Sequence, residues 1–311
     1  MNKLNNRQSK NHEQTADSIA YLLGFIGILG FSMVLPVTKI VVASLDPLLA
    51  GLGRSFILLI PAVLVLWFFK VPVPTKNELK AYFFIILGVI VGFPLLSAFS
   101  MKEVASGQGA IIISILPLFT AIAGAILMQQ RPSWGFWLVS FIGAGLVLAF
   151  LLNHTGGRLV KGDYLLIIAS IVCAFGYAEG AKMAKKINGG FVIAWAIVLS
   201  APFTAIPIFI TLPQQSWNLP NEVIWAFCYT SLIAQWLAFV FWYGGLARGG
   251  IVRVSQVQLL QPFLTFIGAA YFANESISLS MLLFAVAVTM TVFIGKKMPI
   301  LEKSVIVKSI V

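Results

Sequence analysis

The chain consists of apolar blocks of about 20 residues separated by short polar breaks, and no other feature limits its fold as strongly. A helix of that length spans the ~30 Å hydrocarbon core of a bilayer at 1.5 Å rise per residue. Stretches such as IIISILPLF and VLVLWFF are apolar on every side, whereas the strands of a membrane barrel alternate. Because lipid offers the backbone no hydrogen bonds, such blocks must be helices. With 59% hydrophobic and 10% charged residues, we expect an all-α membrane protein.

Ten blocks can be counted, and the polar segment NHTGGRLVKGD divides them into two sets of five. We predict a polar tail over 1–18, a first five-helix repeat over 19–152, an outer linker over 153–162, a second five-helix repeat over 163–297 and a second tail over 298–311. The predicted spans are 19–41, 48–69, 80–101, 105–128, 134–152, 163–182, 190–211, 222–244, 251–273 and 278–296.

Basic residues are distributed unequally between the two ends of the predicted helices. With the N-terminus inside, the inner segments hold sixteen lysines and arginines, and the outer segments hold only Lys102, Arg158 and Lys161. Cytoplasmic loops of membrane proteins carry such an excess, so we predict that both termini are cytoplasmic and that the chain lies in the cytoplasmic membrane. The same excess explains the net charge of +11 without a nucleic-acid partner.

Two proline-containing stretches resemble each other at a shift of 145 positions. The shift places Pro117 on Pro262, and the small residues 123–125 on 268–270. Because each set has five spans, the two stretches lie on helices of opposite direction. Inverted repeats of this kind are typical of secondary transporters, which bind substrate near the midplane where the halves meet.

A proline inside a helix removes one backbone hydrogen bond and clashes with the preceding turn. In lipid the freed carbonyl must be met by a neighbour, a hydroxyl group or water. We therefore predict that Pro117 and Pro262 kink their helices. The kinks either shape the packing alone or act as hinges that line a central path.

Polar and aromatic residues within the spans are candidates for substrate contact, because burying them unpaired is costly. Gln258, Gln261 and Thr265 share one helix face at spacings of three and four. The further candidates for a cavity lining are Arg54, Gln108, Ser114, Trp236, Trp242 and Tyr243. The alternatives are interhelical hydrogen bonds, an interfacial aromatic belt and, for Arg54, a snorkelling side chain or a pair with Asp46.

Glu179 is a carboxylate inside a predicted span, in the stretch GYAEGAKMAKK. An intramembrane carboxylate is a default candidate for a proton relay. Lys182, three positions further on, offers an ion pair near the cytoplasmic edge instead. The sequence favours neither interpretation over the other.

Catalytic and metal-binding patterns are not evident. Both histidines lie in polar segments, and Cys173 and Cys228 lie in apolar blocks, which argues against a metal cluster or a disulfide framework. An intramembrane enzyme would need a nucleophile with its base, or a metal cluster, at one depth. We expect no enzyme, metal or cofactor, and a non-transporting assembly or sensor protein is the main alternative to a transporter.

The stretch FWYGGLARGGIVRVSQVQLLQPFLTFIGAAYFANESIS resembles the closing signature of EamA-type carriers of the drug/metabolite transporter superfamily. Tyr243 and Leu246 stand at the family's aromatic helix end, Pro262 opens its proline helix, and Glu275 is the glutamate before the last span. Each of these motifs is loose when taken alone.

The first half resembles the same family, through Arg54 in the second helix and Pro117 in the fourth. Gln130 departs from it, since a glutamate is common there, and Glu179 has no counterpart in the pattern. The resemblance covers residues 19–297 and implies a ten-helix carrier that exports amino acids, related metabolites or toxic compounds by alternating access. It is compatible with proton coupling and implies no oligomeric state.

Overall fold

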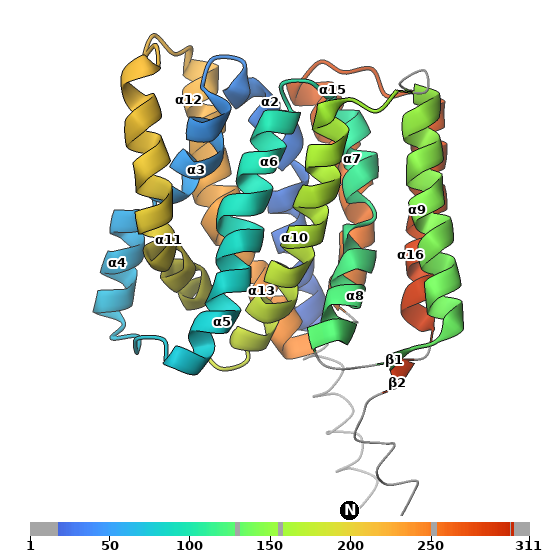
Figure 1. Ribbon diagram of the computed structural model, residues 1–311, viewed down its shortest axis with the longest axis horizontal. Coiled ribbons are helices and arrows are strands. Elements are labelled where there is room, and N and C mark those ends of the chain that lie inside the picture. Colours follow the sequence, from blue (N-terminus) through green and yellow to red (C-terminus); the bar gives the residue numbers. More distant parts are fainter. Residues whose placement is uncertain (1–17, 128–130, 155–157, 250–253, 299, 302–311) are drawn as a thin grey trace, which may run out of the picture.

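The structure, a computed structural model, describes residues 18–127, 131–154, 158–249, 254–298 and 300–301, which form a bundle of helices (Figure 1). Within these ranges eight helices are long and apolar enough to cross a membrane: Ser18–Val42, Pro47–Phe68, Lys76–Ser100, Ser106–Leu127, Trp134–Asn153, Lys161–Met183, Gly189–Gln214 and Asn221–Gly249. Two shorter apolar helices follow, Val257–Phe272 and Leu279–Gly295. The prediction of a helical membrane protein is confirmed. Gln130 and most of both predicted tails lie outside the described residues.

Local breaks divide these helices into shorter elements. After the helix over 18–32, the first half contains α2 (Val34–Val42), α3 (Pro47–Phe56), α4 (Leu59–Phe68), α5 (Lys76–Ile85), η1 (Ile86–Gly92), α6 (Phe93–Ser100), α7 (Ser106–Ile113), α8 (Leu116–Leu127) and α9 (Trp134–His154). The second half contains α10 (Lys161–Met183), α11 (Gly189–Thr211), η2 (Leu212–Gln214), α12 (Asn221–Cys228), η3 (Tyr229–Leu237), α13 (Ala238–Gly249), η4 (Ser255–Leu260), α15 (Gln261–Phe272) and α16 (Leu279–Lys297). In the described part of the chain, β structure is limited to one antiparallel pair, β1 (Arg131–Pro132) with β2 (Ile300–Leu301).

The outer surface of the bundle is apolar. Trp67 is 76% exposed, and Phe141 and Phe203 are each 72% exposed. Soluble monomers rarely expose large apolar patches, whereas a surface of this kind matches the hydrocarbon of a bilayer. The helices α9 and α16 begin 145 residues apart and pack together at one edge of the bundle (Figure 1). The protein is therefore a multi-pass membrane protein.

Polar contacts tie the loops together at each end of the bundle. At one end, the Glu275 carboxylate accepts hydrogen bonds from the start of α7. At the other end, Lys186 Nζ donates to Glu78 Oε1 at 2.9 Å. We name these the Glu275 end and, after a buried tyrosine described below, the Tyr243 end. The helix that carries Pro117 consists of α7 followed by α8, and it begins at the end where α15, the helix that carries Pro262, finishes. These two helices therefore run antiparallel.

Both halves contain a π-helical segment at the same place in the repeat. Adding 145 to the residues of η1 gives 231–237, which lie within η3. A π-helical turn disturbs the regular hydrogen-bond ladder and often marks a functional site. The two segments are joined directly, since Gln235 Nε2 donates to the carbonyl oxygen of Val89 at 2.9 Å. Ser55 Oγ donates to the next carbonyl, that of Ile90, at 3.2 Å.

The two prolines of the repeat occupy matching positions as well. Pro117 lies in the first turn of α8, directly after a turn at 114–115 that interrupts the helix. Pro262 lies in the first turn of α15, directly after the 3-10 segment η4. Both helices thus change geometry just before their proline, at the level where the two halves meet.

Candidate functional site

Two small cavities lie next to each other between helices of both halves. Their volumes are about 20 Å³ and about 10 Å³, close to the space that one water molecule needs. Both are lined by Phe31, Val34, Phe93 and Gln261. The larger cavity adds Arg54, Val89, Leu116, Cys173, Tyr177, Ala234 and Phe239, and the smaller one adds Leu35, Ala110, Ile113, Pro262 and Thr265.

The larger cavity lies where the two repeats contribute equivalent positions. The shift of 145 residues pairs Val89 with Ala234, and it pairs Leu116 with Gln261. All four residues line this cavity. Inverted repeats place substrate sites at this kind of junction, so we take the larger cavity, together with its neighbour, as the candidate site.

Arg54 is the charged residue of the cavity lining. It lies on α3, its side chain is only 4% exposed, and its Nε has no hydrogen-bond partner. The close approach of α3 to α6 holds it there, since a Cβ at Gly51, one turn earlier, would lie 2.7 Å from Leu95 Cα. Asp46 does not neutralise it, because the Asp46 carboxylate caps α3 by accepting from Leu48 N at 2.8 Å. The guanidinium is thus buried without a counter-ion among the described ion pairs.

Aromatic rings cluster beside Arg54. The Phe31 ring stacks against Tyr177 at 6.2 Å between centroids and meets the edge of Phe239 at 4.7 Å. Trp242 completes the cluster, 5.8 Å from Tyr177. Tyr177 and Cys173, one turn apart on α10, both line the larger cavity. The site therefore combines one cationic side chain, that of Arg54, with an apolar and aromatic surface.

Buried amide groups adjoin the cavity with part of their hydrogen-bonding capacity unused. Gln261 lines both cavities, is 7% exposed, and its Oε1 has no partner. Gln258, one turn earlier, belongs to neither lining, and both of its amide atoms are unpaired. A buried polar atom left without a partner costs about 1–3 kcal/mol, so Gln261 Oε1 is available to a molecule that enters. Thr265 is already satisfied, because its hydroxyl donates to the carbonyl oxygens of Ser32 and Gln261.

The remaining sequence candidates lie outside the lining of the two cavities. Gln108 Nε2 donates to Asp163 Oδ1 at 2.6 Å near the Glu275 end. Ser114 Oγ donates to the carbonyl oxygen of Ile111 at 2.5 Å, in the break before α8. Trp236 is half-buried, whereas Trp242 is fully buried in the aromatic cluster.

Tyr243 lies between helices, away from the cavities. Its hydroxyl donates to the carbonyl oxygen of Gly176 at 3.1 Å, and a Cβ on Gly180 would overlap that hydroxyl. Glu179, the next residue to Gly180, has a side chain that is 8% exposed and pairs with Lys182 Nζ at 3.5 Å. Glu179 is six residues from Cys173 on α10, roughly 9 Å along the helix.

Sequence reasoning missed several residues of the site. Phe31, Phe93 and Cys173 line the cavity but belong to no polar motif. Gln235 is recognisable as a polar residue of the predicted eighth span, but its contact between η3 and η1 was not predicted; it stands 145 positions after Ile90. Applying the repeat shift to the whole chain, and not only to the proline stretches, would have indicated that Gln235 lies at the junction of the halves.

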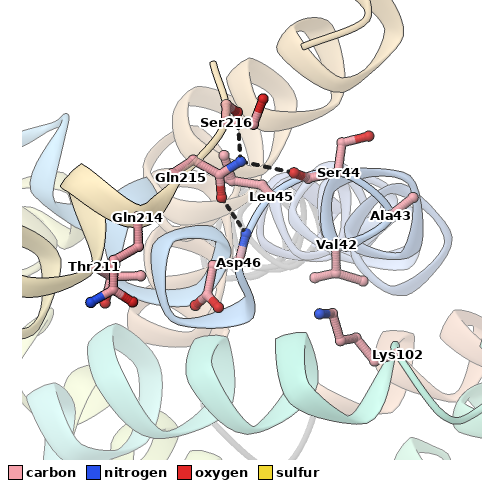
Figure 2. A pocket seen from close by; sticks show the side chains of 10 residues that line it. All are labelled: Val42, Ala43, Ser44, Leu45, Asp46, Lys102, Thr211, Gln214, Gln215 and Ser216. Carbon is pink, nitrogen blue, oxygen red and sulfur yellow. Dashed lines mark hydrogen bonds between the residues drawn. The ribbon is translucent and has the colours of Figure 1, made fainter. Parts of the chain in front are cut away.

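A polar hollow of about 310 Å³ opens at the Glu275 end (Figure 2). Gln215 crosses it, since its Oε1 accepts from Asp46 N at 2.9 Å and its Nε2 donates to the Ser44 carbonyl oxygen at 3.0 Å. Its lining is Val42, Ala43, Ser44, Leu45, Asp46, Lys102, Thr211, Gln214, Gln215 and Ser216. None of these residues also lines the two central cavities. It is a hollow separate from the two central cavities.

Comparisons with known proteins agree with this architecture. Residues 18–152 and 160–294 each match the model of the EamA-like transporter family. The chain is 36% identical over 278 residues to the "Uncharacterized transporter YdeK" of Bacillus subtilis (strain 168), across 89% of this chain and 96% of that protein. It is 21% identical to the "Uncharacterized transporter YoaV" of the same organism, across 89% of this chain and 97% of that protein. A solved structure, described only as a crystal structure of a protein, shares the fold with a TM-score of 0.62 at 16% identity, across 89% of this chain and 98% of that chain.

Proposed function

Because the chain belongs to the EamA-like transporter family, we propose that it is a secondary transporter that exports a small metabolite, an amino acid or a related compound, by alternating access. Family membership makes it a membrane transporter of the drug/metabolite transporter superfamily and not an enzyme. The substrate class, the direction and the membrane, which we take to be the cytoplasmic membrane, are parts of the proposal.

The observation that carries this proposal is a small, partly polar cavity at the junction of two repeats that have the same backbone irregularities. In each half a π-helical segment and a proline-marked helix break reach this junction. Helices bend most readily at such places, because the regular hydrogen-bond ladder is already interrupted. The breaks can therefore serve as hinges about which one half moves against the other.

In this arrangement the two repeats are inverted and all ten apolar helices cross the membrane. The antiparallel courses of α7 and α15 support the inversion. The excess of basic residues supports a cytoplasmic position for the Tyr243 end and for both termini. The contacts at the Glu275 end and at the Tyr243 end would then open in turn, outward and inward.

Glu179 is our candidate for the proton relay of this carrier. Its carboxylate is buried, and Oε2 has no hydrogen-bond partner besides the ionic contact with Lys182. The Lys182 side chain is 57% exposed, which links the buried carboxylate to the aqueous side. A buried carboxylate with such access can take up and release a proton as the carrier changes state.

The test is an untargeted comparison of the medium around cells that overproduce the wild type with the medium around cells that overproduce Pro117→Ala/Pro262→Ala. The two proteins are matched for abundance in the membrane, and Phe141→Leu serves as a lipid-facing control, since Phe141 is 72% exposed. We expect a small set of metabolites enriched outside wild-type and control cells only. No enrichment for any solute, with the wild type correctly inserted, would reject export and favour uptake or a non-transporting assembly or sensor role.

A further inference from the structure

We infer that the central site binds the carboxylate of an organic monoanion, with Arg54 as its counter-ion and the aromatic cluster as the contact for an apolar remainder. The inference rests on the proposed transport function and names the substrate class of the same site. It follows from the unpaired charge of Arg54, the free hydrogen-bond acceptor of Gln261 and the aromatic rings that line the cavity.

The charge of Arg54 is the first step. Burying a guanidinium without a partner is costly, and proteins keep such groups paired unless a ligand completes them. The ion pairs of the described residues are Lys39–Glu275, Lys182–Glu179 and Lys186–Glu78, and Arg54 takes part in none of them. Its side chain is 4% exposed and lines the larger cavity, so it does not snorkel to water. An anion that enters the cavity would supply the missing partner.

The second step is the kind of anion. A guanidinium binds a carboxylate through two parallel N–H···O bonds, which a planar carboxylate matches well. The described lining of both cavities holds one cationic residue, Arg54, and no acidic residue. A single cation neutralises a monoanion, whereas a phosphate-type dianion would stay under-compensated in apolar surroundings. A solute with a net positive charge would be repelled by the uncompensated charge of Arg54.

The third step concerns the rest of the molecule. Phe31 and Phe93 line both cavities, and Phe239 lines the larger one, so a ligand held by Arg54 would lie against rings. Gln261, shared by both cavities, has a free Oε1 that can accept one hydrogen bond from a hydroxyl group of the solute. The class is therefore a monocarboxylate with a hydroxyl donor and an apolar side, such as an aromatic or aliphatic hydroxy acid.

The experiment has two arms that separate this inference from the transport proposal. First, the metabolites enriched around wild-type cells in the excretion assay are sorted by charge, and we expect monocarboxylates to dominate. Second, purified full-length protein is titrated with 3-phenyllactate and with its neutral amide, and thermal stabilisation is measured. We expect the acid to stabilise the wild type at a concentration at least tenfold lower than the amide. Arg54→Gln should abolish this preference, and Arg54→Lys should weaken it.

Each outcome decides something. If enriched metabolites carry no carboxylate, or if acid and amide act equally on the wild type, the inference is overturned while the transport proposal stands. If no metabolite is enriched, the transport proposal fails with it. The acid and amide comparison uses the wild type alone, so it remains decisive even if both Arg54 variants fold poorly.

Discussion

The two ends of the bundle are closed by different chemistry. At the Glu275 end, charged and polar groups join the two halves, whereas at the Tyr243 end an aromatic ring is packed against glycines in addition to the Lys186–Glu78 ion pair. A charged contact can exchange its partners for water when it opens, so its cost of opening is moderate. A packed contact loses its complementarity on any change of volume. The two ends should therefore respond to different substitutions.

The Glu275 end depends on one carboxylate that reaches from the second half to the first. Oε1 accepts from Ser106 N and Ser106 Oγ, and Oε2 accepts from Gly107 N, each at 2.8 Å. These backbone groups open α7 and would otherwise lack partners within the helix. Lys39 Nζ lies 3.4 Å from Oε1. Asn274 turns the chain toward α7 through a φ of 50°, a conformation that asparagine tolerates better than most residues.

The Tyr243 end depends on the absence of side chains opposite one ring. A Cβ on Gly180 would overlap the Tyr243 hydroxyl, and a Cβ on Gly189 would lie 2.6 Å from Tyr243 Cβ. The ring is fully buried as a result, and its hydroxyl donates to the carbonyl oxygen of Gly176. Helices of membrane proteins use small residues in this way to approach closely. The ring can pack here because Gly180 and Gly189 have no side chains.

The largest effect should follow from Gly180→Leu, because the new side chain occupies the space of the Tyr243 ring. Overpacking of this kind costs about 1–3 kcal/mol, which shifts the balance toward an open Tyr243 end by about fivefold to 150-fold. We expect export to be lost and Cys173, which lines the cavity, to be alkylated faster from the cytoplasmic side in a Cys228→Ser background. Inverted membrane vesicles with a charged thiol reagent give the rate.

Gly145→Leu is the matched control, because a Cβ at Gly145 meets nothing within 4 Å. It should label Cys173 and export solute as the wild type does. Wild-type export by the Gly180 variant would contradict a closure based on packing at the Tyr243 end.

Glu275→Ala should have the next largest effect, and at the opposite end. It removes the acceptor for three hydrogen bonds at the start of α7 and leaves Lys39 with only the Val104 carbonyl oxygen, at 2.9 Å. Lost hydrogen bonds to a charged group amount to about 1.5–3 kcal/mol each in favourable cases, so we expect Cys173 to be labelled at least tenfold faster from the outside. Right-side-out vesicles give this rate.

Glu222→Ala controls for the loss of a negative charge, since Glu222 is an exposed acid in the first turn of α12. It should leave labelling unchanged. Faster labelling from the cytoplasmic side in the Glu275 variant would reverse the assignment of the two ends. Unchanged labelling from both sides would show that this contact does not hold the structure closed.

How far the sequence could predict this molecule differs between its helices and its contacts. Apolar blocks of membrane-spanning length indicate the helices directly, because lipid allows no other backbone arrangement for them. The basic residues and the repeat shift predict their order and the twin proline breaks. The π-helical segments have no comparable signal in composition, and the pairing of Gln235 with Val89 depends on how two distant helices pack.

The candidate site shows the same limit. The position of Arg54 within a span predicts that it is buried. The sequence does not predict that it lacks a counter-ion, because Asp46 is close to it in sequence. In the structure the Asp46 carboxylate accepts a hydrogen bond from Leu48 N instead. Trp242 and Tyr243 have the composition of a cavity lining, yet they pack into helix contacts. The space that receives Tyr243 is set by glycines on α10 and α11, about 55 to 65 positions earlier, which only the tertiary structure brings together.

Tyr243→Phe should have a smaller effect than either change above. It keeps the ring against Gly180 and removes one hydrogen bond, to the carbonyl oxygen of Gly176. A neutral hydrogen bond contributes about 0.5–1.5 kcal/mol, so Cys173 labelling from the cytoplasmic side should rise only a few-fold and export should persist. If this variant behaved like Gly180→Leu, the hydroxyl group and not the packed ring would close the Tyr243 end.

Glu179→Gln should have the smallest effect on the contacts of the Tyr243 end. It is nevertheless the most informative test of the difference between the two ends, because Glu179 is next to Gly180 at the Tyr243 end. Its partner Lys182 is 57% exposed, and ion pairs with such exposed groups contribute about 0–1 kcal/mol, so Cys173 labelling should stay within a few-fold of the wild type. If Glu179 is the proton relay, the substitution should nevertheless remove the response of export to an imposed pH gradient, measured in proteoliposomes. Lys182→Gln, which breaks the same pair but keeps the carboxylate, should retain that response. A Glu179→Gln carrier that still follows the gradient would reduce Glu179 to an ion pair and leave the Tyr243 end without a part in proton coupling.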